Sequence, residues 1–333
     1  MAPLTIKPEE EKRLKGMGFL NNKGTDEFSA RILTVNGRVT TEQMKVIQEA
    51  AEKYGNGIVG LTSRMTFEVQ GIPADKAEAF QAEIAKAGLV TGGTGSKVRP
   101  VVSCKGTICQ YGQIDTFALS EKIHETFYLG WHDVLLPHKF KIAVGGCPNN
   151  CVKPDLNDLA VIGQTVVEVG EDECNGCKTC AALASCPMGA LSRDDEGTIQ
   201  LDESKCNNCG RCVHLGNDGK MDVCPFGAMQ PKLRGGYKIY IGGRWGKWVT
   251  RGMAIDKVFK TEEEVLAVIE KAILLFREQG KTGERFAQTI ERIGFENVQA
   301  QLLSDDILSR KQAILEAKLH LTGGAKCLSL IHI

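Results

Sequence analysis

The chain has 333 residues, of which 42% are hydrophobic and 25% are charged, and these are the proportions of a globular protein. Its 41 basic and 41 acidic side chains give a formal net charge of zero, so no global field favours nucleic acid or an anionic membrane as a partner. The amino terminus lacks the apolar core of a signal peptide, and no run approaches the roughly 18 apolar residues of a membrane-spanning helix. We therefore expect a cytoplasmic protein in which any attraction for an anion is local.

Residues 1–95 alternate predicted strands with predicted helices. In the second predicted strand Met65, Phe67 and Val69 alternate with polar residues, and the last predicted helix is Ala-rich and amphipathic. This β-α-β-α order predicts a small open sheet covered by helices. In chain order we expect a polar arm or first helix at 1–25, a strand at 29–37, a helix from 40 or 41 to 54, a strand at 57–71 and a helix at 75–88.

A second lobe is predicted over residues 96–170 and 233–300. A C-terminal helical tail is predicted over residues 301–327. The stretch TEEEVLAVIEKAILLF opens with Thr261 and Glu264 at the spacing of a capping box, which predicts the start of a helix. In this lobe and tail we expect strands at 98–104, at 135–146 and between 155 and 169, and helices at 114–128, 261–276 and 299–321.

The 13 cysteines of the chain are not scattered. Twelve of them fall into three sets of four, which is the ligand count of three cubane iron–sulfur clusters. A disulfide framework is the alternative, but such frameworks belong to short secreted chains. The remaining residue, Cys327, receives no role. Residues 328–333 match the translation of a transposase sequencing-adapter end, so we exclude them from the expected fold and expect the natural reading frame to be lost near Cys327.

Residues 171–232 differ from the rest of the chain in their dense cysteines and short turns, which predict an inserted module. The module contains the runs CNGCKTC and CNNCGRC, each followed at a distance by Cys-Pro, and this pattern is typical of a two-cluster ferredoxin. Structural zinc is the alternative. In such modules the fourth ligand of each cluster comes from the other run. One predicted cluster therefore takes Cys174, Cys177, Cys180 and Cys224, and the other takes Cys206, Cys209, Cys212 and Cys186.

The stretch KFKIAVGGCPNNC, residues 139–151, joins a predicted strand to a Gly-Gly turn and two cysteines. Lys139 and Lys141 are two residues apart, so both face one side of the strand. A matching pair, Cys104 and Cys109, lies upstream. We expect the four thiolates of Cys104, Cys109, Cys147 and Cys151 to hold a further iron–sulfur cluster, with Cys151 also touching a second metal centre.

With these motifs, residues 25–280 resemble the sirohaem-dependent nitrite and sulfite reductases, especially the anaerobic or dissimilatory sulfite reductase subunits that carry an inserted ferredoxin. The resemblance implies an α+β fold, a nitrite/sulfite reductase half-repeat. Its parts are a ferredoxin-like βαβ lobe, a sirohaem/4Fe-4S α/β lobe and an inserted 2[4Fe-4S] module of the bacterial ferredoxin type. It also implies sirohaem and three [4Fe-4S] clusters, one of them coupled to the sirohaem.

The resemblance also implies roles for individual residues. Cys151 is the axial bridge from the cluster to the sirohaem iron, and Gly145, Gly146 and Asn149 lie beside the cofactor, the glycines making room for the macrocycle. Four cations hold the substrate and the sirohaem carboxylates. Fixed positive charges are needed there, because they offset the free energy lost when a dianion is removed from water. A solvated sheet edge is the alternative for each cation alone. These cations are Arg64, Arg99, Lys139 and Lys141.

The function implied is the six-electron reduction of sulfite to sulfide, with electrons entering through the ferredoxin module from a donor protein, a flavoprotein or an iron–sulfur subunit. A sirohaem nitrite reductase, which makes ammonia, is the first alternative. A non-catalytic electron-transfer subunit is the second, favoured by four residues between Cys104 and Cys109 where the family has five. Because the GGCP turn occurs once, we expect a homodimer or a complex with a related subunit.

Overall fold

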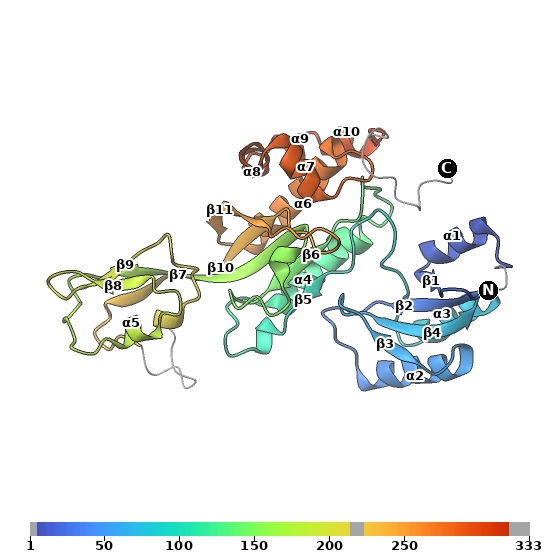
Figure 1. Cartoon of the computed structure of the whole chain (residues 1–333), viewed down its shortest axis with the longest axis horizontal. Coiled ribbons are helices and arrows are strands. Elements are labelled where there is room, and N and C mark those ends of the chain that lie inside the picture. The colour runs from blue at the N-terminus through green and yellow to red at the C-terminus, as the bar shows by residue number, and fades with distance from the viewer. Residues whose placement is uncertain (1–4, 214–222, 320–333) are drawn as a thin grey trace.

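The computed structural model describes residues 5–213 and 223–319, so Cys327 and the adapter-like tail lie outside the described residues. Three separate apolar cores divide the described chain into an N-terminal lobe, a main lobe and a small inserted module. In Figure 1 the main lobe lies in the middle, with the N-terminal lobe on the right and the inserted module on the left. The exact domain boundaries proposed from the sequence stay a prediction.

The N-terminal lobe is an antiparallel sheet of order β1-β2-β4-β3 covered by helices. Helix α2 starts after Thr40, within the predicted range, at a capping box in which Thr40 and Gln43 bond each other's backbone. Ile47 of α2 and Phe80 of α3 are fully buried in the core. The elements are α1 (Pro8–Gly16), β1 (Phe19–Asn21), β2 (Glu27–Ile32), α2 (Thr41–Tyr54), β3 (Val59–Leu61), β4 (Phe67–Pro73), the 3₁₀ turn η1 (Ala74–Lys76) and α3 (Ala77–Ala85).

The single strand expected at 57–71 is two strands, β3 and β4, joined by a tight hairpin turn. The Thr62 hydroxyl accepts hydrogen bonds from the backbone N–H groups of Arg64 and Thr66, each at 3.2 Å, and Met65 has a φ of 56°. A side chain that satisfies neighbouring backbone N–H groups competes with strand pairing, so the chain turns here. Arg64 consequently lies at the tip of a hairpin and not within a strand.

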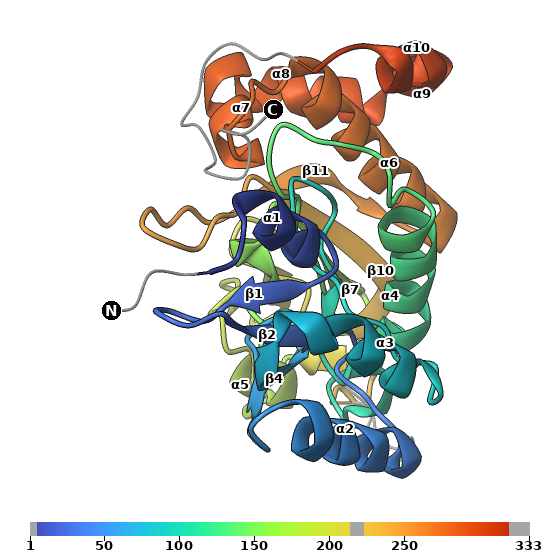
Figure 2. The same ribbon diagram turned by 90° about the vertical axis from the view of Figure 1, so that its right-hand side faces the viewer.

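The main lobe is a mixed sheet of order β11-β10-β7-β6-β5, in which β5, β6 and β7 are parallel and β7, β10 and β11 antiparallel. Helices α4 and α6 pack on one side of it, where Lys122 bonds Glu262 (Figure 2). The elements are β5 (Val102–Ser103), η2 (Gly106–Ile108), α4 (Thr116–Ile123), the π-helix η3 (His124–Leu129), β6 (Ile142–Gly145), η4 (Pro154–Leu156), β7 (Leu159–Val169), β10 (Met229–Ile241), β11 (Met253–Phe259) and α6 (Glu262–Gln279).

Helix α6 begins at the predicted capping box of Thr261 and Glu264, and this expectation is confirmed. The continuous helical stretch expected at 299–321 is instead a series of short helices. Leu302, Ile307 and Ile314 of this region are buried in the main core, so the predicted tail is part of the main lobe. Across residues 5–213 and 223–319, no helix has the length and apolarity that a bilayer crossing requires. The short helices are α7 (Phe286–Ile293), α8 (Phe295–Leu303), α9 (Asp306–Ser309) and α10 (Lys311–Glu316).

The inserted module is connected to the main lobe by two long strands, β7 and β10, which pair with each other as far as Val169 and Met229 (Figure 1). Strand β10 therefore starts before residue 233, where the main lobe was expected to resume. The module's own core is small, and most of its cysteines pack against that core. The elements of the module are α5 (Ala181–Ser185), β8 (Leu191–Arg193), β9 (Ile199–Leu201) and η5 (Arg211–Val213).

Candidate functional site

Four cysteines of the main lobe come together at one edge of its sheet. Cys104 follows β5 and Cys147 follows β6, and because these strands are parallel their carboxyl ends share an edge. The Gly146 N–H donates to the Cys104 sulfur at 3.1 Å. Burial raises the pKa of the Cys147 thiol, and the neighbouring Cys104, Cys151 and Cys109 raise it further. The structure thus groups the four thiols that the sequence analysis assigned to one cluster.

The Gly-Gly turn between β6 and Cys147 allows two loops to approach closely. A Cβ atom on Gly146 would lie 2.7 Å from the Cα of Gly106, and one on Gly145 would lie 3.1 Å from the Cγ of Pro154. The space into which a side chain at either glycine would extend is therefore filled by protein, and the expected contact of the two glycines with the macrocycle stays a prediction. Asn149 is exposed on the same loop, and its backbone N–H bonds the Cys147 sulfur.

The cysteines of the inserted module form two groups, each of which mixes the two sequence runs. This crossed arrangement is the one that the pattern of a two-cluster ferredoxin predicts. One small cavity is lined by Cys186, Cys206, Cys209 and Cys212, and another is lined by Cys174, Cys177, Cys180 and Cys224.

Backbone N–H groups point at the sulfur atoms in both groups. The Ala190 N–H lies 3.3 Å from the Cys186 sulfur, and the Ile199 N–H lies 3.4 Å from the Cys174 sulfur. Burial and the adjacent thiols raise the pKa of Cys212 to about 12, so this group needs a cation before all its thiols ionise. Within the described ranges no three Cys, His, Asp or Glu side chains are placed to hold one metal ion. The four cysteines at each cavity have the ligand type and number that a cubane cluster takes.

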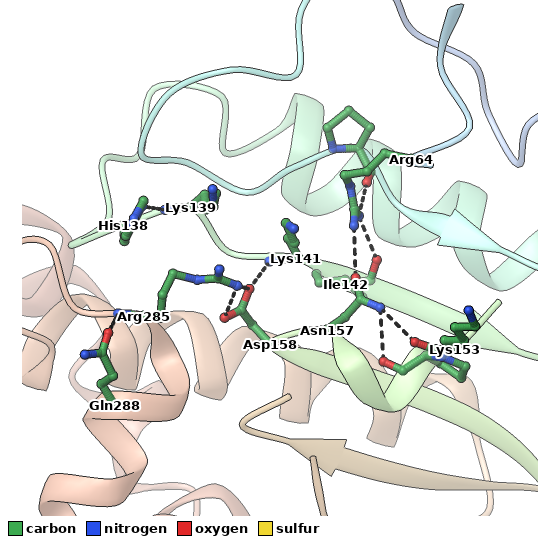
Figure 3. A network of polar contacts seen from close by, with 12 residues as sticks. Arg64, His138, Lys139, Lys141, Ile142, Lys153, Asn157, Asp158, Arg285 and Gln288 are labelled. Carbon is green, nitrogen blue, oxygen red and sulfur yellow. Dashed lines mark hydrogen bonds and ion pairs between the residues drawn. The ribbon is translucent and has the colours of Figure 1, made fainter. Parts of the chain in front are cut away.

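Arg64 fastens the N-terminal lobe to the main lobe. Its guanidinium donates to Asn157 Oδ1 at 2.9 Å, to the Pro100 carbonyl at 2.6 Å and to the Ile142 carbonyl at 3.3 Å (Figure 3). Burial lowers the pKa of Arg64 to about 10, which leaves the group charged at neutral pH. Asn157 in turn donates to the Lys153 carbonyl, so Arg64 is linked to the loop that carries the predicted axial cysteine.

Lys141 lies between Arg64 and an ion pair that the sequence analysis missed (Figure 3). Arg285 donates to both carboxylate oxygens of Asp158, at 2.8 and 2.7 Å, and the Lys141 N–H donates to the same carboxylate at 2.9 Å. Burial raises the pKa of Asp158, and Arg285 opposes that shift. Burial and the adjacent cations Arg64, Arg285 and Lys139 lower the pKa of Lys141 to about 8. Arg285 follows no recognisable motif, and only a buried Asp158 in need of a partner would have indicated it.

The other two predicted cations belong to the same positively charged region. The Lys139 N–H donates to His138 Nδ1 at 2.8 Å, and the Arg99 guanidinium donates to the Gly93 carbonyl. Burial, followed by the charges of Lys139, Arg285 and Arg99, lowers the pKa of His138 to about 4. In a chain of zero net charge, this local gathering of cations is the expected footprint of an anion site.

The cations and the cysteines lie at opposite ends of strand β6. Lys139 and Lys141 precede the strand, and Cys147 follows it. The connection to β7 then carries Cys151 back toward Asn157, the residue that Arg64 contacts. A cavity of about 560 Å³ lies between the two lobes, within the size range of cofactor sites. Its lining includes Cys104, Cys151, Thr62, Met65 and Arg38, and the last of these was also missed by the sequence analysis.

Residues 94–308 match the family model described as the nitrite and sulphite reductase 4Fe-4S domain. The chain belongs to this family. Residues 21–87 match the nitrite/sulfite reductase ferredoxin-like half domain, in agreement with the observed N-terminal lobe. Membership supports sirohaem and a 4Fe-4S cluster as cofactors.

The chain is also similar to individual proteins and to a solved structure. The chain is 31% identical over 257 residues to the coenzyme F420-dependent sulfite reductase of Methanocaldococcus jannaschii, covering 76% of this chain and only 38% of that protein. It is 29% identical over 280 residues to the dissimilatory-type sulfite reductase subunit alpha of Allochromatium vinosum, covering 78% and 64%. The crystal structure of dissimilatory sulfite reductase I shares the fold, with a TM-score of 0.65 at 22% identity over 83% of this chain and 69% of that chain.

Proposed function

We propose that the chain is a catalytic subunit of an anaerobic or dissimilatory-type sulfite reductase, which reduces sulfite to sulfide with six electrons. Electrons enter through the inserted module, which would hold two [4Fe-4S] clusters beside the one in the main lobe. One observation carries the proposal: Arg64, through Asn157, joins the cation region to the loop of Cys151, next to a cavity between the lobes. We place the enzyme in the cytoplasm, where thiols stay reduced.

The residues of the chain have distinct tasks in this proposal. Sirohaem, when bound, would supply the iron that binds the sulfite sulfur, and Cys151 would hold that iron. Lys139, Lys141 and Arg99 would receive the sulfite oxygens and the carboxylates of the cofactor, because fixed charges offset the loss of hydration. Lys141, with its pKa near 8, is protonated at neutral pH, so its Nζ can donate a proton as an oxygen leaves as water.

The separation of cations and cysteines along β6 supports a site completed by a second chain. In a dimer, the cations of one subunit would face the cluster of the other, or of a related subunit. Mixing Cys151→Ser protein with Lys141→Ala protein tests this arrangement. Mixed oligomers should regain part of the wild-type turnover, whereas each variant alone stays inactive. Two folded variants that remain inactive after subunit exchange would rule out a shared site.

The activity itself is tested on the anaerobically purified full chain. We expect sirohaem bands in the visible spectrum, about twelve cluster irons per chain and sulfite-dependent oxidation of reduced viologen with release of sulfide. A preparation without sirohaem bands, or with the irons but without sulfite-dependent oxidation, contradicts the proposal. The bacterial nitrite reductase of Bacillus subtilis is also a relative, at 22% identity. A higher kcat/KM for nitrite than for sulfite would therefore reassign the substrate.

A further inference from the structure

Gln113 connects a cysteine loop of the main lobe with a cysteine loop of the inserted module. Its backbone N–H donates to the carbonyl of Gly146, the residue before Cys147, at 2.9 Å. Its side-chain Nε2 donates to the carbonyl of Cys209 at 2.6 Å, across 96 positions of the chain. Only covalent bonds and these two hydrogen bonds therefore separate Cys209 from Cys147.

Strand β7 holds the Cys209 loop from a second side. The Thr165 N–H donates to the Asn208 carbonyl at 2.9 Å, and Thr165 forms a parallel bridge with Cys209. A Cβ atom on Gly210 would lie 2.9 Å from the Cβ of Thr165, so the two segments pack tightly. The loop is thereby fixed in position relative to the main lobe and not only tethered to it.

The two cysteine groups of the module differ in their distance from the main lobe. The cavity of the group Cys174, Cys177, Cys180 and Cys224, here called the outer group, is lined by residues of the module alone. Cys209 of the inner group (Cys186, Cys206, Cys209 and Cys212) lines a cavity of about 720 Å³ together with Gln113 and Cys147. The structure thus orders the groups from outer to inner to main lobe.

We propose that Gln113 is a positioning residue for electron transfer from the inner-group cluster to the cluster of the main lobe. This rests on the cofactors proposed above. In each step the inner cluster loses one electron and the main-lobe cluster gains it, without bond formation or proton transfer. An iron–sulfur or flavin donor protein replaces the electron through the outer group. Electrons tunnel more readily through covalent and hydrogen-bonded links than across a gap, and Gln113 supplies such a link.

The two polar atoms of the Gln113 amide differ in their hydrogen bonding. Its Oε1 is buried and has no hydrogen-bond partner within the described chain. Buried side-chain oxygens normally have a hydrogen-bond partner, and leaving one unpaired is destabilising. The orientation is set by Cys209, because only the NH₂ of the amide can donate to a carbonyl. The donor of this amide is therefore directed at the Cys209 loop.

The test compares Gln113→Leu with Gln110→Leu in the full, cluster-loaded chain. Gln110 lines the same cavity, and its side chain makes no hydrogen bond to Cys209. After flash reduction without sulfite, freeze-quench EPR follows the electron from the module clusters to the main-lobe cluster. Transfer should slow by about tenfold in Gln113→Leu, the size typical of losing a partner outside the ligand shell, with iron content and reduction potentials unchanged. Gln110→Leu should transfer at the wild-type rate, and a wild-type rate in Gln113→Leu would overturn the proposal.

A second variant covers the case in which Gln113→Leu loses its clusters. Gln113→Glu keeps the shape of the side chain, but a carboxylate cannot donate to the Cys209 carbonyl. It should slow transfer as well, and a wild-type rate in this variant would refute the positioning role. Because the readout needs no substrate, its failure is distinct from that of the proposed function: a chain that fails to reduce sulfite can still show, or fail to show, dependence on Gln113.

Discussion

The main lobe and the inserted module both gather thiols in groups of four, but they differ in what holds the thiols in place. In the main lobe the cysteine loops extend from a sheet whose core contains long buried side chains of α6, among them Ile269 and Phe276. In the module the core is a few residues such as Ala182 and Leu191, with the cysteines packed directly against them. The module should therefore depend on its metal for folding, whereas the main lobe should not.

The largest expected effect comes from removing a ligand of the module. Cys212→Ala should cost the inner cluster and unfold most of residues 171–213 and 223–228, because a bound metal contributes to folding directly where the apolar core is small. Limited proteolysis under anaerobic conditions should show rapid cleavage in the module and protection of the main lobe. Cys109→Ala is the matched control, since it should lose the main-lobe cluster and leave that lobe protected. Equal protection of the module in both variants would contradict the comparison.

The second prediction concerns the buried ion pair beneath Lys141. Asp158→Asn should lower the free energy of unfolding of the main lobe by about 3–5 kcal/mol, because it leaves the Arg285 guanidinium buried without its counter-charge. Urea unfolding followed by tryptophan fluorescence measures the change. Asp306→Asn removes an exposed partner of Arg310 and should cost no more than about 1 kcal/mol. Similar losses of unfolding free energy in the two variants would contradict the prediction, because the buried Asp158 pair would then matter no more for stability than an exposed pair.

The smallest expected effect is a pH dependence. Burial and nearby cations place the pKa of Lys141 at about 8, so the side chain is charged below that pH and loses its charge above it. The kcat/KM for sulfite, which reports the free enzyme, should therefore fall as the pH rises through about 8. Lys141→Arg keeps its charge at high pH, and this decline should disappear. An unchanged decline in Lys141→Arg would assign the titration to another group.

Local patterns in the sequence predicted a large part of this structure. The capping box at Thr261 follows from residue spacing, and the crossed grouping of the module cysteines follows from the motif pattern of two-cluster ferredoxins. Both patterns are visible in a sequence. The hairpin at Arg64 was not predicted, because the competing hydrogen bonds of Thr62 override an alternating pattern that otherwise indicates a strand. The pair of Asp158 and Arg285 depends on a contact across 127 positions, which no local pattern encodes.

The contacts of the Gly-Gly turn also involve segments that are distant in the sequence. A glycine pair before a cysteine indicates a close approach, but the sequence does not say what approaches. The structure shows that Gly106 lies against Gly146 and Pro154 against Gly145. The contacts of Gln113 could not be predicted from the sequence either, because its two hydrogen bonds join loops that are far apart in the chain.

The variant Cys151→Ser tests the central claim most directly, because Cys151 alone is assigned both to the main-lobe cluster and to the sirohaem iron. The measurement is sulfite-dependent oxidation of reduced viologen, with iron counted in the same anaerobic preparation. We predict that turnover is lost while the iron of the inserted module remains. Turnover at the wild-type kcat in a folded Cys151→Ser protein would contradict the account.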